Sequence, residues 1–190
     1  MNVLALCGSL RAASINAALL RAAARLAPEG MAIAVFDGLG SLPLFNPDLE
    51  AAVPAPVRAL HAAVAAADAL LIASPEYAHG VTGTVKNALD WLVAFEPFVH
   101  LPVAVLNASP RAHHADDALR ETLRTMSAVV VDPACVGIPL LGAGLAEDGM
   151  VTSPEVSSAV RGALAALARA VHPRAADGAR AQPGPAFHPR

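Results

Sequence analysis

Five short apolar runs, each separated from the next by a segment with helical spacing, constrain the fold of this chain most strongly. The runs are continuous rather than alternating, and they span residues 2–7, 31–36, 69–73, 103–107 and 129–136. Continuous apolar strands are typical of parallel sheets, because helices cover both faces of such a sheet. The pattern therefore predicts an α/β fold, with a doubly wound, five-stranded parallel sheet in the order 2-1-3-4-5 between two layers of helices.

The segments between these runs carry apolar residues at helical spacing. Ile15, Leu19, Ala22 and Leu26 share one face of the first segment, and similar faces occur in residues 57–67, 85–93 and 119–126. A final helix is predicted to begin at Ser153-Pro154, because serine is a good N-cap and proline suits the first helical position. In a sheet of this kind the ligand crevice lies at the carboxyl ends of the strands.

The end of the sequence differs in composition from the rest. Four prolines occur among the 18 residues from Pro173 to Arg190, with few apolar residues between them. Such a segment cannot bury enough apolar surface to offset the entropy of ordering. We therefore expect one domain over residues 1–172 and a disordered tail over residues 173–190.

Charge and cysteine content exclude several classes of protein. The net charge is −3, which argues against a nucleic-acid binder with a basic face and against the strongly acidic surface of a dedicated electron carrier. No apolar run approaches the roughly 20 residues of a membrane span, and we see no cationic leader. Cys7 and Cys135 match no metal-site spacing and are expected to be buried thiols. These features favour a cytoplasmic protein without a membrane, nucleic-acid or metal partner.

The loop after the first apolar run carries the donors that a phosphate group needs. Gly8 ends the run, and Ser9, Arg11, Ser14 and Asn16 follow within eight residues. Helix N-termini bind anions through free N–H groups and the helix dipole, and an arginine fork suits phosphate oxygens. The loop matches neither a P-loop nor a dinucleotide-binding glycine motif. It therefore predicts a site for a terminal monophosphate, although each residue taken singly could be a turn, cap or solvated side chain.

A second motif follows the third apolar run, and together the two motifs resemble a known family. GSLRAASIN and SPEYAHGVTGTVKNALDWL, at residues 8–16 and 74–92, resemble the NADPH-dependent FMN reductase family. The segment LPLFNPD at residues 42–48 is similar to that family's loop after the second strand. The resemblance covers roughly residues 2–170 and implies a flavodoxin-like three-layer sandwich.

The resemblance also implies an activity, cofactors and contact residues. It implies an FMN-dependent oxidoreductase that passes electrons from NADPH or NADH to flavin, quinone or similar small acceptors by hydride transfer through the bound FMN. No side chain is implied to act as a nucleophile or acid. The residues expected to contact the cofactor are Ser9, Arg11, Ser14, Ile15, Asn16, Pro75, Glu76, Tyr77, Ala78, Ser109 and Arg111.

The loop after the fourth apolar run departs from the family pattern. It contains NASPRAHH at residues 107–114, where the family usually has a glycine-rich stretch that lets backbone approach the flavin. We therefore expect weaker flavin retention, which Arg111 could partly offset. Two alternatives stay open at this point: a flavodoxin-like scaffold that does not turn over, and an electron carrier.

The family resemblance further implies a homodimer or homotetramer. The apolar segment at residues 95–99 is a candidate interface, because clustered exposed apolar groups commonly mark interaction sites. The alternative is that these residues pack under a loop of the same subunit. Trp91 likewise either lies near the interface or fills core space.

Overall fold

The computed structural model describes residues 1–109 and 111–178, with side chains described up to residue 171. Its main sheet is entirely parallel and follows the order β2-β1-β3-β6-β7, while β8 also pairs with β6. The strands are β1 (Asn2–Cys7), β2 (Ala32–Phe36), β3 (Ala69–Ala73), β6 (Pro102–Asn107), β7 (Val129–Val130) and β8 (Val136–Gly137). The predicted parallel sheet and its strand order are confirmed.

The fifth strand differs from its prediction because it is interrupted. A 3₁₀ turn, η4 (Asp132–Ala134), separates β7 from β8, so the expected continuous run over 129–136 is wrong. Pro133 has no N–H to give to a strand ladder and its φ suits a helical turn. The two short pieces still pair with β6 in parallel, through Val103 for β7 and Leu106 for β8.

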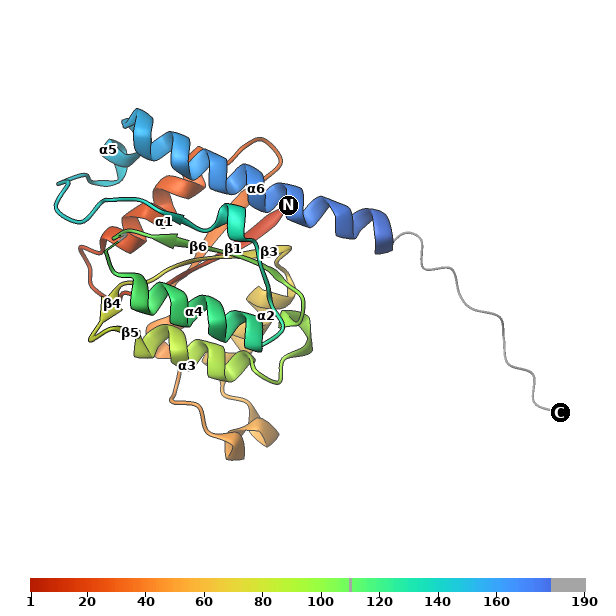
Figure 1. The fold of residues 1–190 in the computed structure, drawn as a ribbon. Helices are drawn as coiled ribbons and strands as arrows, with labels where there is room; N and C mark the ends of the chain where they lie inside the picture. The colour runs from red at the N-terminus through yellow and green to blue at the C-terminus, as the bar shows by residue number, and fades with distance from the viewer. Residues whose placement is uncertain (110, 179–190) are drawn as a thin grey trace.

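Helices cover both faces of the sheet (Figure 1). The helices α1 (Ile15–Leu26), α5 (Glu147–Thr152) and α6 (Pro154–Gly178) lie on one side of the sheet. The helices α2 (Ala55–Ala65), α3 (Gly83–Leu92) and α4 (His113–Thr125) lie on the other. The helix α4 begins at His113, six residues before Leu119, where the apolar face predicted for residues 119–126 begins.

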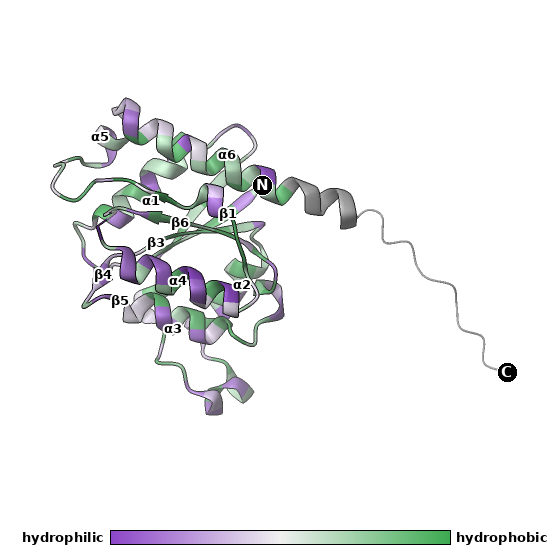
Figure 2. Ribbon diagram, viewed as in Figure 1, coloured by the Kyte–Doolittle hydropathy of each residue, from purple (hydrophilic) through white to green (hydrophobic). Residues whose placement is uncertain are grey.

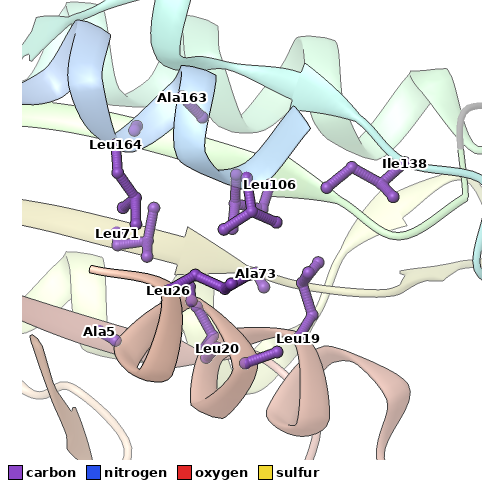
Figure 3. Packing of buried hydrophobic residues seen from close by; sticks show 14 of the residues in the cluster. Ala5, Leu19, Leu20, Leu26, Leu71, Ala73, Leu106, Ile138, Ala163 and Leu164 are labelled. Atoms are coloured by element: carbon purple, nitrogen blue, oxygen red, sulfur yellow. The ribbon is translucent and has the colours of Figure 1, made fainter. Parts of the chain in front are cut away.

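The alternating side chains of each strand divide the core into two clusters. Val3, Ala5 and Cys7 of β1 pack toward α1 and α6, whereas Leu4 and Leu6 pack toward the opposite layer. Figure 3 shows the first cluster, in which Leu19 and Leu20 of α1 and Leu164 of α6 gather with Leu71 and Leu106 of the strands. Hydrophilic residues gather on the outer helices, most densely on α4 (Figure 2). The sheet is thus buried on both faces, as its continuous apolar strands predict.

The connections add short elements that periodicity did not predict. A two-stranded antiparallel hairpin, β4 (Glu76–Tyr77) and β5 (Gly80–Val81), follows β3. The 3₁₀ turns η1 (Gly38–Ser41) and η2 (Pro47–Ala52) form the connection after β2, part of which projects from the body in Figure 1, and η3 (Glu96–Phe98) follows α3.

The segment at 95–99 is only partly the exposed apolar patch that we expected, because Val99 is 40% exposed while Phe98 is not. Phe98 is 1% exposed and belongs to the core, and the Phe95 ring stacks on His61 with centroids 4.1 Å apart. Trp91 is also buried, and its indole N–H donates to the Pro43 carbonyl at 2.8 Å. Phe98 and Trp91 thus pack within their own subunit, and Phe98 is the buried residue of the turn η3.

The last helix extends past the residue at which we placed the end of the domain. α6 continues to Gly178, beyond Pro173, while residues 179–190 of the expected tail lie outside the described residues. The division at residue 172 therefore stays a prediction. In the part of the chain that the structure describes, no helix is long and apolar enough to cross a membrane.

Candidate functional site

An open cleft lies at the carboxyl ends of β1, β3 and β6, where the topology predicts a ligand site. Its volume is about 270 Å³. Three loops supply its walls: the loop from β1 to α1, the loop that follows β3, and the loop from β6 to α4. The lining residues are Ser9, Arg11, Ala13, Ser14, Ile15, Asn16, Ser74, Pro75, Glu76, Tyr77, Asn107, Ala108, Ser109, Ala112 and Leu141.

The first wall depends on the close approach of two loops at Gly8. A Cβ atom at Gly8 would lie 2.2 Å from the Ser74 hydroxyl oxygen, so this position requires glycine. The Gly8 N–H donates to the Ala73 carbonyl at 2.9 Å, which continues the ladder between β1 and β3. This contact turns the chain toward α1 at the floor of the cleft.

The start of α1 offers the groups that an anion site needs. Ser14 is the N-cap, and its hydroxyl oxygen accepts a hydrogen bond from the Ala17 N–H at 3.2 Å. Asn16 is 7% exposed, and its side-chain Oδ1 has no protein partner. A buried amide without a partner is expected to meet a bound group or water. The helix N-terminus and this amide therefore fit a ligand that carries a phosphate and hydroxyl groups.

Arg11 supplies the positive charge of this wall. Its side chain is exposed, and among the described residues no carboxylate forms an ion pair with it. The Arg11 N–H donates to the Ser9 hydroxyl at 3.4 Å, which shapes the loop. A guanidinium without a protein partner at a helix N-terminus suits phosphate oxygens.

The second wall is the β4–β5 hairpin, which is fixed to α4. Its two-residue turn has positive φ at both positions, 49° at Ala78 and 59° at His79, as in a type I′ turn. The Glu76 carboxylate accepts a hydrogen bond from the Ala115 N–H in the first turn of α4 at 2.9 Å. The hairpin is therefore held at the positive end of that helix.

The third wall is held in place by one side chain. The Asn107 amide donates to the Ala112 carbonyl at 3.0 Å, and its oxygen accepts from the Ser109 N–H at 2.9 Å. The Ala112 N–H also donates to the Ser109 carbonyl at 2.8 Å. Hydrogen bonds from Asn107 thus hold Ser109 and Ala112 close to the end of β6.

The structure brings nine of the eleven predicted contact residues to the cleft. The lining includes Ser9, Arg11, Ser14, Ile15, Asn16, Pro75, Glu76, Tyr77 and Ser109. Ala78 and Arg111 do not line it. Ala78 lies at the tip of the hairpin turn, and Arg111 is exposed just before α4 begins. The role of each residue toward a cofactor stays a prediction.

Sequence reasoning missed six lining residues for different reasons. Ser74, Asn107 and Ala108 lie at the ends of the third and fourth strands, so the rule for parallel sheets could have found them. Ala13 and Ala112 are small, and small residues carry no chemical signal. Leu141 comes from the loop that follows β8, and no motif in that loop indicates its position.

A half-buried ion pair lies behind the cleft on α4. Burial raises the pKa of the Asp116 carboxyl, while Arg120, at 2.7 Å, opposes that rise. One Asp116 oxygen, Oδ1, and the Arg120 Nε have no partner in the protein. Burial also raises the pKa of the Cys135 thiol, so this cysteine is a poor nucleophile at neutral pH. Among residues 1–109 and 111–178 no group of His, Cys, Asp and Glu could hold a metal ion.

Comparisons with known proteins agree with this geometry. The family model described as NADPH-dependent FMN reductase matches residues 1–140. An NAD(P)H-dependent FMN reductase of Pseudomonas aeruginosa is 42% identical over 112 residues, which are 57% of this chain and 60% of that protein. A quinone reductase of Pseudomonas putida is 34% identical over 147 residues, 73% of this chain and 75% of that protein.

A solved structure shows the same architecture. The flavoenzyme NAD(P)H:(acceptor) oxidoreductase FerB of Paracoccus denitrificans superposes with a TM-score of 0.75 at 26% identity, over 90% of this chain and 97% of that one. The predicted flavodoxin-like fold is confirmed by this likeness and by a flavodoxin-like protein of Agrobacterium tumefaciens, with a TM-score of 0.59 at 14% identity. The chain spans about 47% to 60% of the length of the first curated relatives that it matches.

Proposed function

The chain belongs to the NADPH-dependent FMN reductase family, and on that premise we propose that it uses FMN to pass electrons from NADH or NADPH to a small acceptor. The observation that carries the proposal is the cleft itself. It brings the start of α1, the hairpin and the loop before α4 together around one open cavity. A flat ring system with a phosphate-bearing chain has the shape of such a cleft.

The first loop supports FMN rather than an unphosphorylated flavin. The backbone at the start of α1, the Ser9 hydroxyl and the Arg11 guanidinium would hold the phosphate. The unpartnered Asn16 Oδ1 would accept a hydrogen bond from a hydroxyl group of the adjoining chain. The Arg11 guanidinium and the buried Asn16 amide therefore lie on the same loop, and both would bind the same ligand.

The other two loops would orient the ring. Pro75 to Tyr77 would contact it mainly through backbone, since the Glu76 carboxylate is engaged by α4. Ser109 and Ala112 would bound the opposite side, in positions fixed by Asn107. When bound, FMN supplies the two-electron chemistry, so the protein contributes binding, orientation and exclusion of water.

The relatives favour quinones and flavins as acceptors. The matched proteins include an NAD(P)H-dependent FMN reductase, a quinone reductase and an NAD(P)H:(acceptor) oxidoreductase. The mouth of the cleft carries exposed Tyr77 and Leu141, each 60% exposed, which would contact a flat apolar acceptor. We propose that coenzyme and acceptor use this mouth in alternation.

The proposal extends to the assembly and the compartment. We propose a homodimer or homotetramer, as the family resemblance implies, and exposed Val99 leaves the segment at 95–99 a candidate for part of its interface. We also propose a reducing, cytoplasmic location, which the free thiols of Cys7 and Cys135 support. Light scattering at micromolar concentration tests the proposed oligomeric state, and a monomeric mass would contradict it.

One experiment tests the function directly. Purified protein is incubated with FMN, freed of excess ligand and examined by absorbance, and NADPH oxidation is then followed with a quinone. We expect a bound-flavin spectrum and acceptor-dependent oxidation. Protein that binds no FMN would be a scaffold. Protein that holds FMN but oxidises neither NADPH nor NADH would be an electron carrier, and either result contradicts the proposal.

A further inference from the structure

A second cavity shares no lining residue with the cleft. Its volume is about 160 Å³, and it lies where η2 and the residues after it meet α2 and the end of α3. The lining residues are Glu50, Val53, His61, Trp91, Ala94 and Phe95. The activity proposed above uses none of these side chains, so a ligand in this cavity would be a separate one.

Aromatic rings form the walls of the second cavity. The His61 and Phe95 rings stack with centroids 4.1 Å apart and planes at 8°. The Trp91 indole donates to the Pro43 carbonyl at 2.8 Å, and the Phe45 ring meets it edge-on with centroids 5.0 Å apart. These contacts hold the rings in place without a ligand. An apolar cavity of about 150 Å³ accommodates a benzene ring, so the second cavity has room for one aromatic ring.

The polar groups of the second cavity are acceptors. The His61 Nε2 lies 2.9 Å from the Trp91 carbonyl, and a carbonyl only accepts, so Nε2 carries the proton. The other nitrogen of a neutral imidazole, Nδ1, is then an acceptor. Glu50 adds an exposed carboxylate, and within the described chain no ion pair joins it to a basic side chain. Acceptors of this kind select a ligand with N–H donors and a positive charge.

Charged groups around the second cavity agree with this selection. No lysine or arginine is among its lining residues. Glu96, next to Phe95, adds a second exposed carboxylate. Arg58 lies one turn before His61 on α2, and its guanidinium donates to the Val53 carbonyl at 2.5 Å. The two carboxylates at the cavity outnumber this guanidinium, so the local charge favours a cation.

We propose that the second cavity binds a small aromatic amine in its cationic form, with the ring against Phe95 and the ammonium group beside Glu50. The volume sets the size of the ligand at one ring, and the stacked aromatic side chains favour a flat partner. An ammonium group close to an aromatic face also gains a cation–π attraction. Because the two cavities share no residue, this site can be tested separately from the FMN cleft.

Trp91 provides a direct measurement, because it is the only tryptophan of the chain and gives a single indole N–H resonance. Full-length protein, labelled with a nitrogen isotope and supplied with FMN, is titrated at neutral pH with three ligands of similar size. These are phenethylammonium, which is a cation, neutral phenethyl alcohol and anionic phenylacetate. We expect the cation to shift the resonance and to bind about fivefold more tightly than the alcohol, with the anion weakest.

Two variants separate the charge of the site from its shape. Glu50→Gln should lower the preference for the cation over the alcohol to below about twofold. Glu96→Gln is the matched control, because it removes an exposed carboxylate that does not line the cavity, and it should keep the preference. Ala94→Leu places a larger side chain in the cavity and should weaken the cation and the alcohol alike.

Three results would overturn the inference. The first is equal binding of the cation and the alcohol by the wild-type protein, and the second is a preference that survives in Glu50→Gln. The third is an Ala94→Leu protein that binds the cation as tightly as the wild type does. A Trp91 resonance that shifts with protein concentration in the absence of ligand, and not with the cation, would assign the cavity to a second copy of the chain.

Discussion

The Glu76 carboxylate and the Ala115 N–H form a hydrogen bond of 2.9 Å between segments 39 residues apart. The first turn of α4 has no side-chain cap of its own, because Ala112 occupies the N-cap position. A carboxylate near the start of a helix also interacts favourably with the helix dipole. Glu76 therefore acts as a distant cap that joins two walls of the cleft.

Replacing Glu76 should weaken both the fold and the cleft. We expect Glu76→Ala to lower the free energy of unfolding by about 1 kcal/mol, as loss of an N-cap does, and Glu76→Gln to lower it less. Urea denaturation measures this difference. A Glu76→Ala protein with unchanged stability would show that the carboxylate does not cap α4.

The hairpin turn should be stabilised by a residue that accepts positive φ. Ala78 has a φ of 49°, a region that costs most L-residues roughly 1–2 kcal/mol but not glycine. We expect Ala78→Gly to raise the thermal midpoint, since the native strain is removed. Ala66→Gly is the control, because Ala66 has a φ of −87° and gains nothing from glycine. An equal change in both variants would contradict this account.

Arg11 should contribute to binding of FMN but not of riboflavin. Arg11→Ala removes a charge-assisted contact worth roughly 1.5–3 kcal/mol, which is about a tenfold to hundredfold loss of affinity. Fluorescence titration of the wild-type and variant proteins with both flavins separates the phosphate from the ring. If the variant lost affinity for riboflavin as strongly as for FMN, Arg11 would not hold the phosphate.

The regular part of the fold could be predicted from the sequence because it depends on local pattern. Continuous apolar runs predict strands buried on both faces, and Ser14 or Ser153-Pro154 predict helix starts. The interrupted fifth strand could have been inferred only from Pro133. The hairpin at Glu76–Val81 could not, because its two strands of two residues each are too short for any periodicity.

The residues of the candidate site also fall into two groups, those that local sequence predicts and those that only tertiary packing brings to the cleft. Ser9 to Asn16 are adjacent in the sequence and lie together at the start of one helix, so their proximity follows from local structure. Leu141 reaches the cleft through tertiary packing alone, and the His79–His114 stack depends on how the hairpin meets α4. Long-range contacts of this kind leave no trace in spacing.

An ion-pair cluster between α1 and α5 should make stability depend on acid pH. The Glu147 carboxylate accepts from the Arg21 Nε at 2.7 Å, and Arg21 and Arg25 hold the pKa of Glu147 below its usual range. A depressed carboxyl pKa in the folded state contributes stability above the unfolded pKa of about 4.3, and this is lost as pH falls through the folded pKa.

Glu147→Gln isolates this contribution. Above about pH 5 the variant should be less stable than the wild-type protein, and the difference should vanish as pH falls well below about 4.3. Urea denaturation of the wild-type and variant proteins, repeated across this pH range, measures the difference in stability. Glu29→Gln is the control, because Glu29 is exposed on the surface. A difference that stayed constant with pH would mean that the ion pairs do not act through the carboxylate charge.

Asn107 should support FMN binding by holding in place the loop before α4, which lacks glycines. Its side chain bonds to Ser109 on one side and to Ala112 on the other, so Asn107→Ala removes two hydrogen bonds at once. Each is worth roughly 0.5–1.5 kcal/mol, and we expect both stability and FMN affinity to fall, the latter about tenfold. Asn46→Ala is the matched control, since Asn46 caps η2 through the Asp48 N–H and does not line the cleft. If FMN affinity stayed the same while stability fell, the loop before α4 would be a scaffold element, and the ring would have to be oriented by Pro75 to Tyr77 alone.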